Sequence, residues 1–280
     1  MPDRRLRCAR ITLGYDGTDF AGSQSQPGVR TVQDELQRAI DTVAHGSERC
    51  VLAGRTDKGV HAHGQVASVN VRWTKVAGQL RESLDAVSPA DVIIRHVAWA
   101  EPGFHARHDA RWREYRYRIV VSERPPVFDA RFAWWRRMSV DDDAAADAAR
   151  RFIGRHSFGA FAGHGWSRSR EREELVRTVR ECEWRRSDAW DGLDHRVSAE
   201  LRVTASGFLP RMVRNMVSAI VTVGTGARSP AWIDDLIASG ARQELGDAAP
   251  PHGLTLWRVT YDEQDDVSAG SRSPGECEYQ

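Results

Sequence analysis

The sequence predicts an α+β protein in which the element order β-α-β-β-α-β occurs twice. Segments with alternating apolar residues predict strands, and segments with apolar residues three and four positions apart predict helices. By this criterion both halves of the 280-residue chain give the same order of elements. That order is typical of a ferredoxin-like unit, a sheet covered by helices on one face. We therefore expect two ferredoxin-like halves with a merged, mostly antiparallel sheet and a central cleft between them.

In the first half, strands are expected over residues 7–15, 50–53, 65–71 and 92–99. A helix is expected over residues 31–44, because Thr31 is a suitable N-cap. A second helix is expected over residues 74–87. The apolar residues that share one face of these helices are Val32, Leu36, Ile40 and Val43 in the first, and Val76, Leu80, Leu84 and Val87 in the second.

In the second half, strands are expected over residues 112–121, 178–184, 196–204 and 254–261. Helices are expected over residues 141–153, with Ser139 as the N-cap, over 209–223 and over 230–239. The last helix has Ser229 at its N-cap, Pro230 at its first position and Gly240 beyond its end, which are the residue types favoured there.

These elements divide the chain into two halves and a tail. The first half is expected over residues 1–106 and the second over 107–263, with the connection near 101–110. Residues 264–280 are acidic, rich in Ser and Gly and poor in apolar side chains, so we expect a disordered tail.

Composition limits the class of protein. Apolar residues make up 41% and charged residues 28% of the chain, which is typical of a globular protein. No apolar run approaches the ~20 residues of a membrane helix, and the N-terminus lacks the apolar stretch of a signal peptide. We expect a cytoplasmic protein.

The four cysteines form no CxxC pair, which argues against zinc-ribbon and thioredoxin-like chemistry. The net charge of +1 excludes a histone-like polycation but not nucleic-acid binding, which follows local charge.

A charged loop is expected after the strand that ends at Ala53. Its sequence, from Ala53 to His61, is AGRTDKGVH. The glycines at both ends allow a tight loop and a close approach of the backbone to a ligand. One carboxylate between two cations suits an active-site loop. From the residues alone, an ordinary surface turn remains the alternative, because Asp and Gly are expected in turns.

Basic and aromatic residues alternate in the segment 104–118, FHARHDARWREYRYR. On the strand, Arg113, Tyr115 and Tyr117 share one face, and Trp112, Arg116 and Arg118 lie on the other. Cations for phosphate and rings for stacking are what unpaired or flipped bases require. Binding of RNA or another polyanion therefore explains this segment better than a solvated strand does.

Two further features concern single side chains. Arg214, on the helix over 209–223, is either a solvated charge or an arginine held at the edge of the core to neutralise a buried carboxylate. His61 and His63 form an HxH pair, but no third or fourth ligand follows at a recognisable spacing, so no metal site is expected.

Eight motifs stand out along the chain: YDGTDFAG (15–22), QPGVRTVQDEL (26–36), AGRTDKGVHA (53–62), FHAR (104–107), REYRYRI (113–119), GRHSF (154–158), FLPRMVRNMV (208–217) and PPHGLTL (250–256). Through these eight motifs the chain resembles the TruA family of tRNA pseudouridine synthases. They occur in the family's order and extend over nearly the whole chain.

The resemblance implies a pseudouridine synthase fold with a central RNA-binding cleft. It implies conversion of uridine to pseudouridine in the anticodon stem-loop of tRNA, at positions 38, 39 and 40, by a homodimer without a cofactor or metal. Asp57 would be the catalytic aspartate and Arg214 its partner. Arg55 would help to displace the target base, and Tyr115 would stack on it.

One position departs from the family pattern, which usually reads Gly-Trp-Gln where this chain has Gly22-Ser23-Gln24. A large ring is thus missing from a loop expected near the RNA face, and the Arg- and Ser-rich segment 161–174 is a candidate to replace it.

The implied chemistry fits the residues. The C1′–N1 bond must break, the uracil must turn, and C5 must bond to C1′, so one ionised carboxylate suffices, either as a nucleophile or as a base that removes a ribose proton. Arg214 would keep Asp57 ionised in a dry pocket, and Tyr115 is a candidate to accept the proton from C5.

Two alternatives stay open: a non-catalytic RNA-binding protein with tandem ferredoxin-like units, and a metal-dependent phosphoesterase that uses His61, His63 and Asp57.

Overall fold

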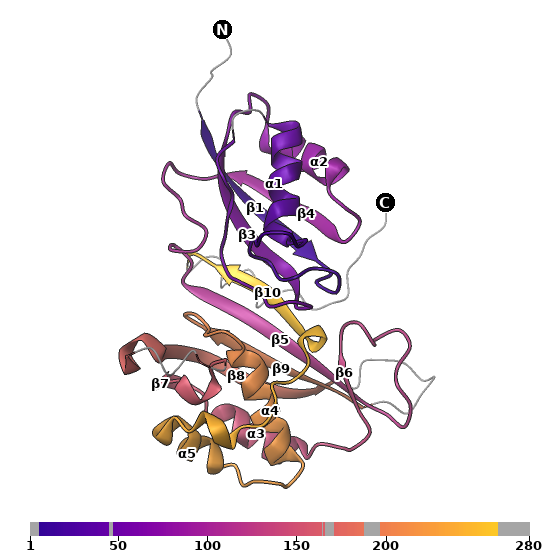
Figure 1. Cartoon of the computed structure of the whole chain (residues 1–280), viewed down its shortest axis with the longest axis vertical. Coiled ribbons are helices and arrows are strands. Elements are labelled where there is room, and N and C mark those ends of the chain that lie inside the picture. Colours follow the sequence, from indigo (N-terminus) through magenta and orange to yellow (C-terminus); the bar gives the residue numbers. More distant parts are fainter. Residues whose placement is uncertain (1–5, 45–46, 164, 166–170, 188–196, 263–280) are drawn as a thin grey trace.

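The computed structural model describes residues 6–44, 47–163, 165, 171–187 and 197–262. Its central feature is one ten-stranded sheet with the order β4-β1-β3-β10-β5-β9-β8-β7, in which β2 also pairs with β3 and β6 with β5 (Figure 1). The expected α+β class with a large, mostly antiparallel sheet is confirmed. The tail over 264–280 lies outside the described residues.

The first half supplies β1 (Arg7–Tyr15), α1 (Val32–Val43), β2 (Val51–Leu52), β3 (His61–Val71), α2 (Ala77–Val87) and β4 (Val92–Trp99). Strand β1 lies between β3 and β4 and is antiparallel to both, and β2 pairs with the other edge of β3. This arrangement is that of a ferredoxin-like sheet.

The second half supplies β5 (Trp112–Val121), β6 (Trp134–Arg136), α3 (Asp142–Arg150), β7 (Gly154–Ser157), β8 (Val176–Ser187), β9 (Val197–Ala205), α4 (Met212–Gly224), α5 (Trp232–Ser239) and β10 (Leu254–Thr260). Strand β5 lies between β10 and β9, and β8 follows β9, so the first-half arrangement recurs.

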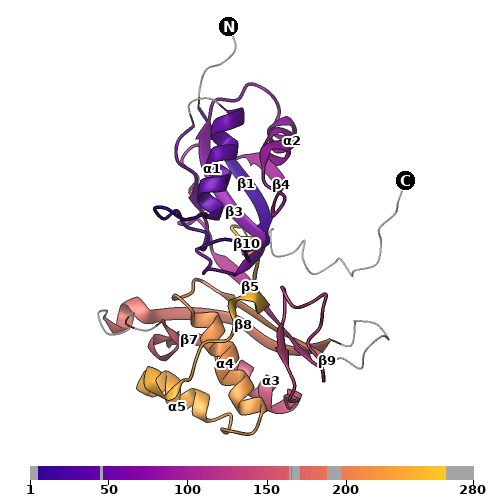
Figure 2. The same ribbon diagram turned by 45° about the vertical axis from the view of Figure 1, so that its right-hand side comes forward.

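The two halves share the sheet through β3 and β10. These strands pair in parallel at two positions, where Thr255 lies opposite His61 and Leu256 opposite Ala62. Figures 1 and 2 show α1 and α2 beside the first-half strands and α3, α4 and α5 beside the second-half strands. The division at residues 106 and 107 stays a prediction, because the sheet is continuous across it.

The helices bury most of the apolar faces that the sequence predicts, with differences at their starts and at the end of α2, where Val87 is 39% exposed. In α1, Val32, Leu36 and Ile40 are buried, and the Thr31 hydroxyl caps the helix by accepting from the Asp34 N–H. Helix α2 begins at Ala77 rather than at 74, and Val76 before it is 66% exposed, so Val76 does not belong to the buried face. No helix in the described part of the chain is long and apolar enough to cross a bilayer.

Three helix starts in the second half differ from the prediction. Asp141, not Ser139, caps α3, because its carboxylate accepts the Ala144 N–H. Helix α5 begins at Trp232 after a turn over 229–231, while Gly240 ends it in the left-handed conformation as expected. Helix α4 begins at Met212, after Arg211 at φ 62°, a left-handed conformation that is rare outside glycine. The short strands β6 and β7 were not predicted, since a few residues carry no clear periodicity.

Candidate active site

The loop over residues 53–60, called the Asp57 loop below, lies between β2 and β3, where the two halves meet. Its side chains alternate: Arg55 is exposed, Thr56 is buried and Asp57 is partly buried. The Val60 N–H closes a turn on the Asp57 carbonyl, and Gly59 adopts φ +78°, which explains the glycine at this position. Arg55 and Asp57, on either side of the buried Thr56, are therefore both accessible to solvent.

Asp57 and Arg214 meet across the joint between the halves. Nη1 of Arg214 donates to Oδ2 of Asp57 at 3.2 Å. Arg214 lies in the first turn of α4, and the positive end of a helix dipole also favours an anion there. Nε of Arg214 donates to the Ala249 carbonyl at 2.7 Å, and the Ala249 N–H donates back to the Arg214 carbonyl. These three bonds fix the guanidinium beside the carboxylate.

The expected dry pocket is not closed by this chain alone. The Asp57 side chain is 38% exposed, whereas that of Arg214 is 15% exposed. Water therefore reaches the carboxylate, and the exposed fraction leaves room for a substrate to approach it. Of the two interpretations of Arg214, the structure supports the paired arginine at the edge of the core.

Tyr115 lies directly behind the Asp57 loop. Its ring is 7% exposed and packs edge-on against Phe208, with the ring centres 5.0 Å apart. Its hydroxyl donates to the Arg55 carbonyl at 3.4 Å. Burial raises the pKa of Tyr115, and the Tyr15 hydroxyl, once ionised, and the Asp57 carboxylate raise it further. The phenol is thus neutral and acts as a donor in this state, so it can accept the C5 proton only after losing its own.

Most of the arginines expected to contact phosphates are occupied within the protein. Arg113 donates to four backbone carbonyls, those of Ala53, Arg107, Ala110 and Ser206, at 2.7–3.1 Å. Arg116 and Arg118 lie on the other face of β5 and pair with acidic residues, Arg116 with Glu114 and Glu200, and Arg118 with Glu200. The Arg107 side chain is exposed. Nη2 of Arg113 donates to the carbonyls of both Arg107 and Ala53, so Arg107 lies near the Asp57 loop.

The two histidines of the HxH pair have separate roles. Nδ1 of His61 lies 3.0 Å from the Gly17 N–H, and its Nε2 lies 2.8 Å from the Arg131 carbonyl. His63 instead stacks on Trp257 at 4.3 Å. Within the described ranges, no group of three His, Cys, Asp or Glu residues could hold a metal ion. The geometry thus does not favour the phosphoesterase alternative.

Ser23 is not where the sequence placed it. Rather than lying at an RNA face, it is 1% exposed beneath the Asp57 loop, together with Tyr15, Thr56 and Gln65. This buried polar cluster was missed, because the four residues are separated in sequence and no pattern along the chain shows that their side chains meet. Six residues of the segment 161–174 lie outside the described part of the chain, so its compensating role stays a prediction.

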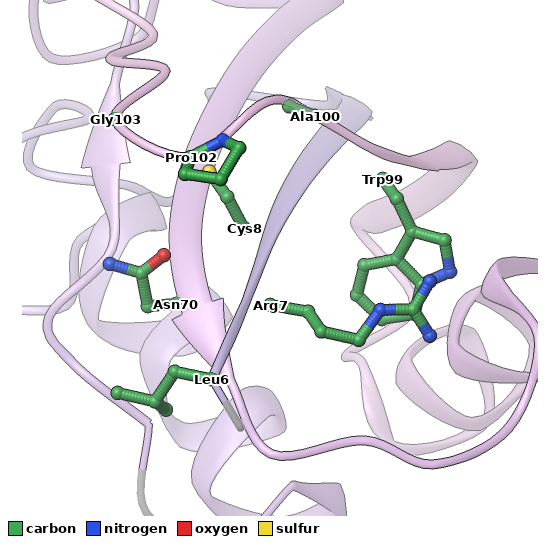
Figure 3. A pocket seen from close by; sticks show the side chains of 8 residues that line it. All are labelled: Leu6, Arg7, Cys8, Asn70, Trp99, Ala100, Pro102 and Gly103. Carbon is green, nitrogen blue, oxygen red and sulfur yellow. The ribbon is translucent and has the colours of Figure 1, made fainter. Parts of the chain in front are cut away.

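A cavity of about 440 Å³ lies at the other end of β1, away from Asp57. Figure 3 shows its lining, in which the Arg7 guanidinium lies over the Trp99 ring, 3.7 Å from its centre. None of the predicted site residues lines it. The site around Asp57 is a partly exposed place at the joint between the halves and is separate from this cavity, and the expected central cleft stays a prediction.

Comparison with known proteins places the chain in a family. The family model described as "tRNA pseudouridine synthase" matches residues 148–262. Over 260 residues the chain is 39% identical to tRNA pseudouridine synthase A of Bacillus licheniformis, which covers 92% of this chain and 99% of the relative. It is 36% identical to the protein of the same name from Bacillus subtilis over the same shares, and 37% identical to that of Geobacillus kaustophilus, over 93% of this chain and 96% of the relative. Matches at this identity over nearly the full length of both proteins show that the chain belongs to the tRNA pseudouridine synthase A family.

Proposed function

We propose that this protein converts uridine to pseudouridine in the anticodon stem-loop of tRNA, at positions 38, 39 and 40, with Asp57 as the catalytic group. The observation that carries the proposal is the partly exposed ion pair between Asp57 and Arg214, at the joint between the halves, in a chain whose relatives are tRNA pseudouridine synthases. The reaction is an isomerisation: the C1′–N1 bond breaks, a C1′–C5 bond forms, N1 gains a proton and C5 loses one.

The geometry supports a role for each residue. The exposed oxygen-bearing end of Asp57 can reach the ribose, either to attack C1′ or to remove a ribose proton. Arg214 donates a hydrogen bond to Oδ2 of Asp57 and so orients the carboxylate. Arg55, exposed beside it, can enter the space that the flipped base leaves, which offsets part of the few kcal/mol that unstacking costs. Tyr115 lies close enough to the loop to contact the base once it is flipped.

The alternative of a non-catalytic RNA-binding protein fits the structure less well. Both candidates must bind RNA, so the paired arginines of the segment 104–118 do not separate them; what separates them is the carboxylate, which a non-catalytic binding protein does not use. It has no need of a carboxylate held by an arginine from the opposite half. The Asp57–Arg214 pair therefore favours catalysis.

Release of tritium from tRNA labelled at C5 of uridine tests the proposal. Wild-type protein should release tritium with and without EDTA, and the nucleosides should then contain pseudouridine. Release that stops with EDTA would favour a metal-dependent reaction, and tRNA binding without release would favour the non-catalytic alternative.

We also propose that the protein acts as a cytoplasmic homodimer that holds tRNA on its joint surface. Large apolar side chains are exposed between β5 and α3: Val127 and Phe128 are 83% and 80% exposed, and Met138 is 65% exposed. Exposed apolar groups of this kind favour burial against a second chain. Light scattering after size-exclusion chromatography should give twice the mass of 31.4 kDa, and a monomer at micromolar concentration would contradict the dimer.

A further inference from the structure

The backbone of the Asp57 loop is held by partners from distant parts of the chain. Each of four successive carbonyls accepts one hydrogen bond: Ala53 from Nη2 of Arg113, Gly54 from Nε2 of Gln65, Arg55 from the Tyr115 hydroxyl, and Thr56 from the Ser23 N–H. Gln65 also accepts the Gly54 N–H through Oε1, so its carboxamide binds both sides of that residue. The loop is therefore fixed up to the residue that precedes Asp57.

The contact nearest to Asp57 is made by Ser23. Oγ of Ser23 accepts the Thr56 N–H at 2.8 Å, while the Ser23 N–H donates to the Thr56 carbonyl at 3.1 Å. Ser23 and Thr56 are 1% and 6% exposed, so water cannot replace these bonds at low cost. The Thr56 side chain is fixed as well, because its hydroxyl lies 2.9 Å from that of Tyr15.

Ser23 is itself held by α1. Its carbonyl accepts the Gln33 N–H at 3.0 Å, and the carbonyl of the preceding residue, Gly22, accepts the Val32 N–H at 3.4 Å. Both donors belong to the first turn of α1, whose N–H groups have no partner within the helix. A rigid element is thus connected to Asp57 through Ser23 and Thr56.

We propose that Ser23 is a positioning residue, which fixes the peptide before Asp57 so that the carboxylate meets Arg214. The inference rests on the proposed function, since it concerns the group proposed as the catalyst. The two hydrogen bonds between Ser23 and Thr56 form a clamp on the loop, and one of them requires the Ser23 side-chain oxygen to accept the Thr56 N–H. The tryptophan usual at this position in the family could not provide it, because an indole is a donor only. In this chain the bond from the Thr56 N–H therefore depends on the hydroxyl of Ser23.

The test compares Ser23→Ala with a matched control, Ser68→Ala. Ser68 is also buried, at 6% exposure, and its Oγ accepts the Ala106 N–H at 3.0 Å, but it lies on β3 away from the Asp57 loop. Both variants lose a buried acceptor of a backbone N–H, so their melting temperatures should fall by similar amounts. Ser23→Ala should lower the single-turnover rate ~10–100-fold, as expected for a misplaced reacting group, with tRNA affinity within twofold. Ser68→Ala should keep the wild-type rate within threefold.

Hydrogen exchange of the peptide over residues 53–60 gives a readout that does not depend on activity. We expect faster exchange in Ser23→Ala and wild-type exchange in Ser68→Ala. Equal losses of rate in the two variants, or unchanged rate and exchange in Ser23→Ala, would overturn the inference. A wild-type protein that releases no tritium would contradict the proposed function instead, while the exchange comparison would still report on the clamp.

Discussion

Nη1 of Arg214 lies 3.2 Å from Oδ2 of Asp57, although the two residues are 157 positions apart in the chain. One belongs to a loop of the first half and the other to the first turn of α4 in the second half. The pair exists only when the halves share the sheet, so docking of the halves and assembly of the site are the same event. The bonds between Arg214 and Ala249 add the segment before β10 to this assembly.

Replacement of Asp57 tests the catalyst directly. Asp57→Asn keeps the shape of the side chain and removes its charge, so tritium release should fall to below about a thousandth of the wild-type rate, the scale for loss of a catalytic group. Affinity for tRNA should stay within a few-fold, because the group acts on the reacting atoms. A variant with higher residual activity would exclude Asp57 as the catalyst.

Replacement of Arg214 should affect activity more than stability. Arg214→Ala leaves Asp57 without its partner and should abolish tritium release. Because Asp57 is 38% exposed, water screens the pair, and we expect a stability loss of only about 1 kcal/mol from it. Arg214→Lys restores the charge but not the fork that also binds Ala249, so its activity should be intermediate. Full activity of Arg214→Ala would show that the pair is not needed.

Tyr115 can be tested against Tyr117, which lies two positions along the same strand. Tyr115→Phe keeps the ring and removes the hydroxyl that donates to the Arg55 carbonyl. If the hydroxyl takes part in proton transfer, the single-turnover rate should fall about 10²–10⁴-fold at normal tRNA affinity. The Tyr117 hydroxyl donates to the Pro250 carbonyl, so Tyr117→Phe should cost about 1 kcal/mol of stability and no activity. A fully active Tyr115→Phe would leave only the ring a role.

Salt dependence should separate exposed arginines from paired ones. Arg107→Ala should reduce the slope of log K against log salt concentration by about 0.7–0.9, the value for one phosphate contact. Arg118→Ala should leave the slope unchanged, because Arg118 lies on the other face of β5 and pairs with Glu200. Titration of tRNA binding at several salt concentrations measures both. Equal slopes for Arg107→Ala and wild type would show that Arg107 is a solvated charge.

Glu114 should make stability depend on pH. Its side chain is 3% exposed and pairs with Arg116, Arg202 and Arg258. Burial alone would raise the pKa of Glu114, but hydrogen bonds from Arg202 and Arg116 outweigh it and lower the pKa below its ordinary value of 4.5. The contribution of Glu114 to stability is therefore complete above pH 4.5 and is lost as the pH falls through the lowered pKa.

Glu114→Gln should accordingly reduce the free energy of unfolding by about 1–3 kcal/mol at pH 7, as for hydrogen bonds to charged groups. The difference from wild type should shrink below pH 4.5. Denaturant unfolding at pH 7 and pH 4 checks this. A difference that does not change with pH would show that the charge of Glu114 is not what stabilises the three central strands.

The order of the longer elements and many of the buried helix faces can be predicted from the sequence. The helical spacing of Leu80 and Leu84 follows from local geometry, which depends only on neighbouring residues, whereas β3 alternates in sequence but is buried on both faces because the rest of the fold covers it. The sequence also placed Asp57 on a loop between two strands and favoured a pseudouridine synthase. Helix starts are harder to predict, because any of several polar residues near Ser139 could cap α3, and in the structure the cap is Asp141.

Only the tertiary structure decided which side chains meet. The pairing of β3 with β10 brings Asp57 to Arg214, and no spacing along the chain encodes that contact. The use of arginines was decided in the same way: five basic residues in the segment 104–118 look alike in sequence, yet Arg113 binds backbone carbonyls while Arg116 binds Glu114. The contact between Ser23 and Thr56 could not be predicted from the sequence either, because the two residues are 33 positions apart. Hydrogen bonds and ion pairs act over a few ångströms, so their partners are fixed only when the folded chain has brought distant segments together.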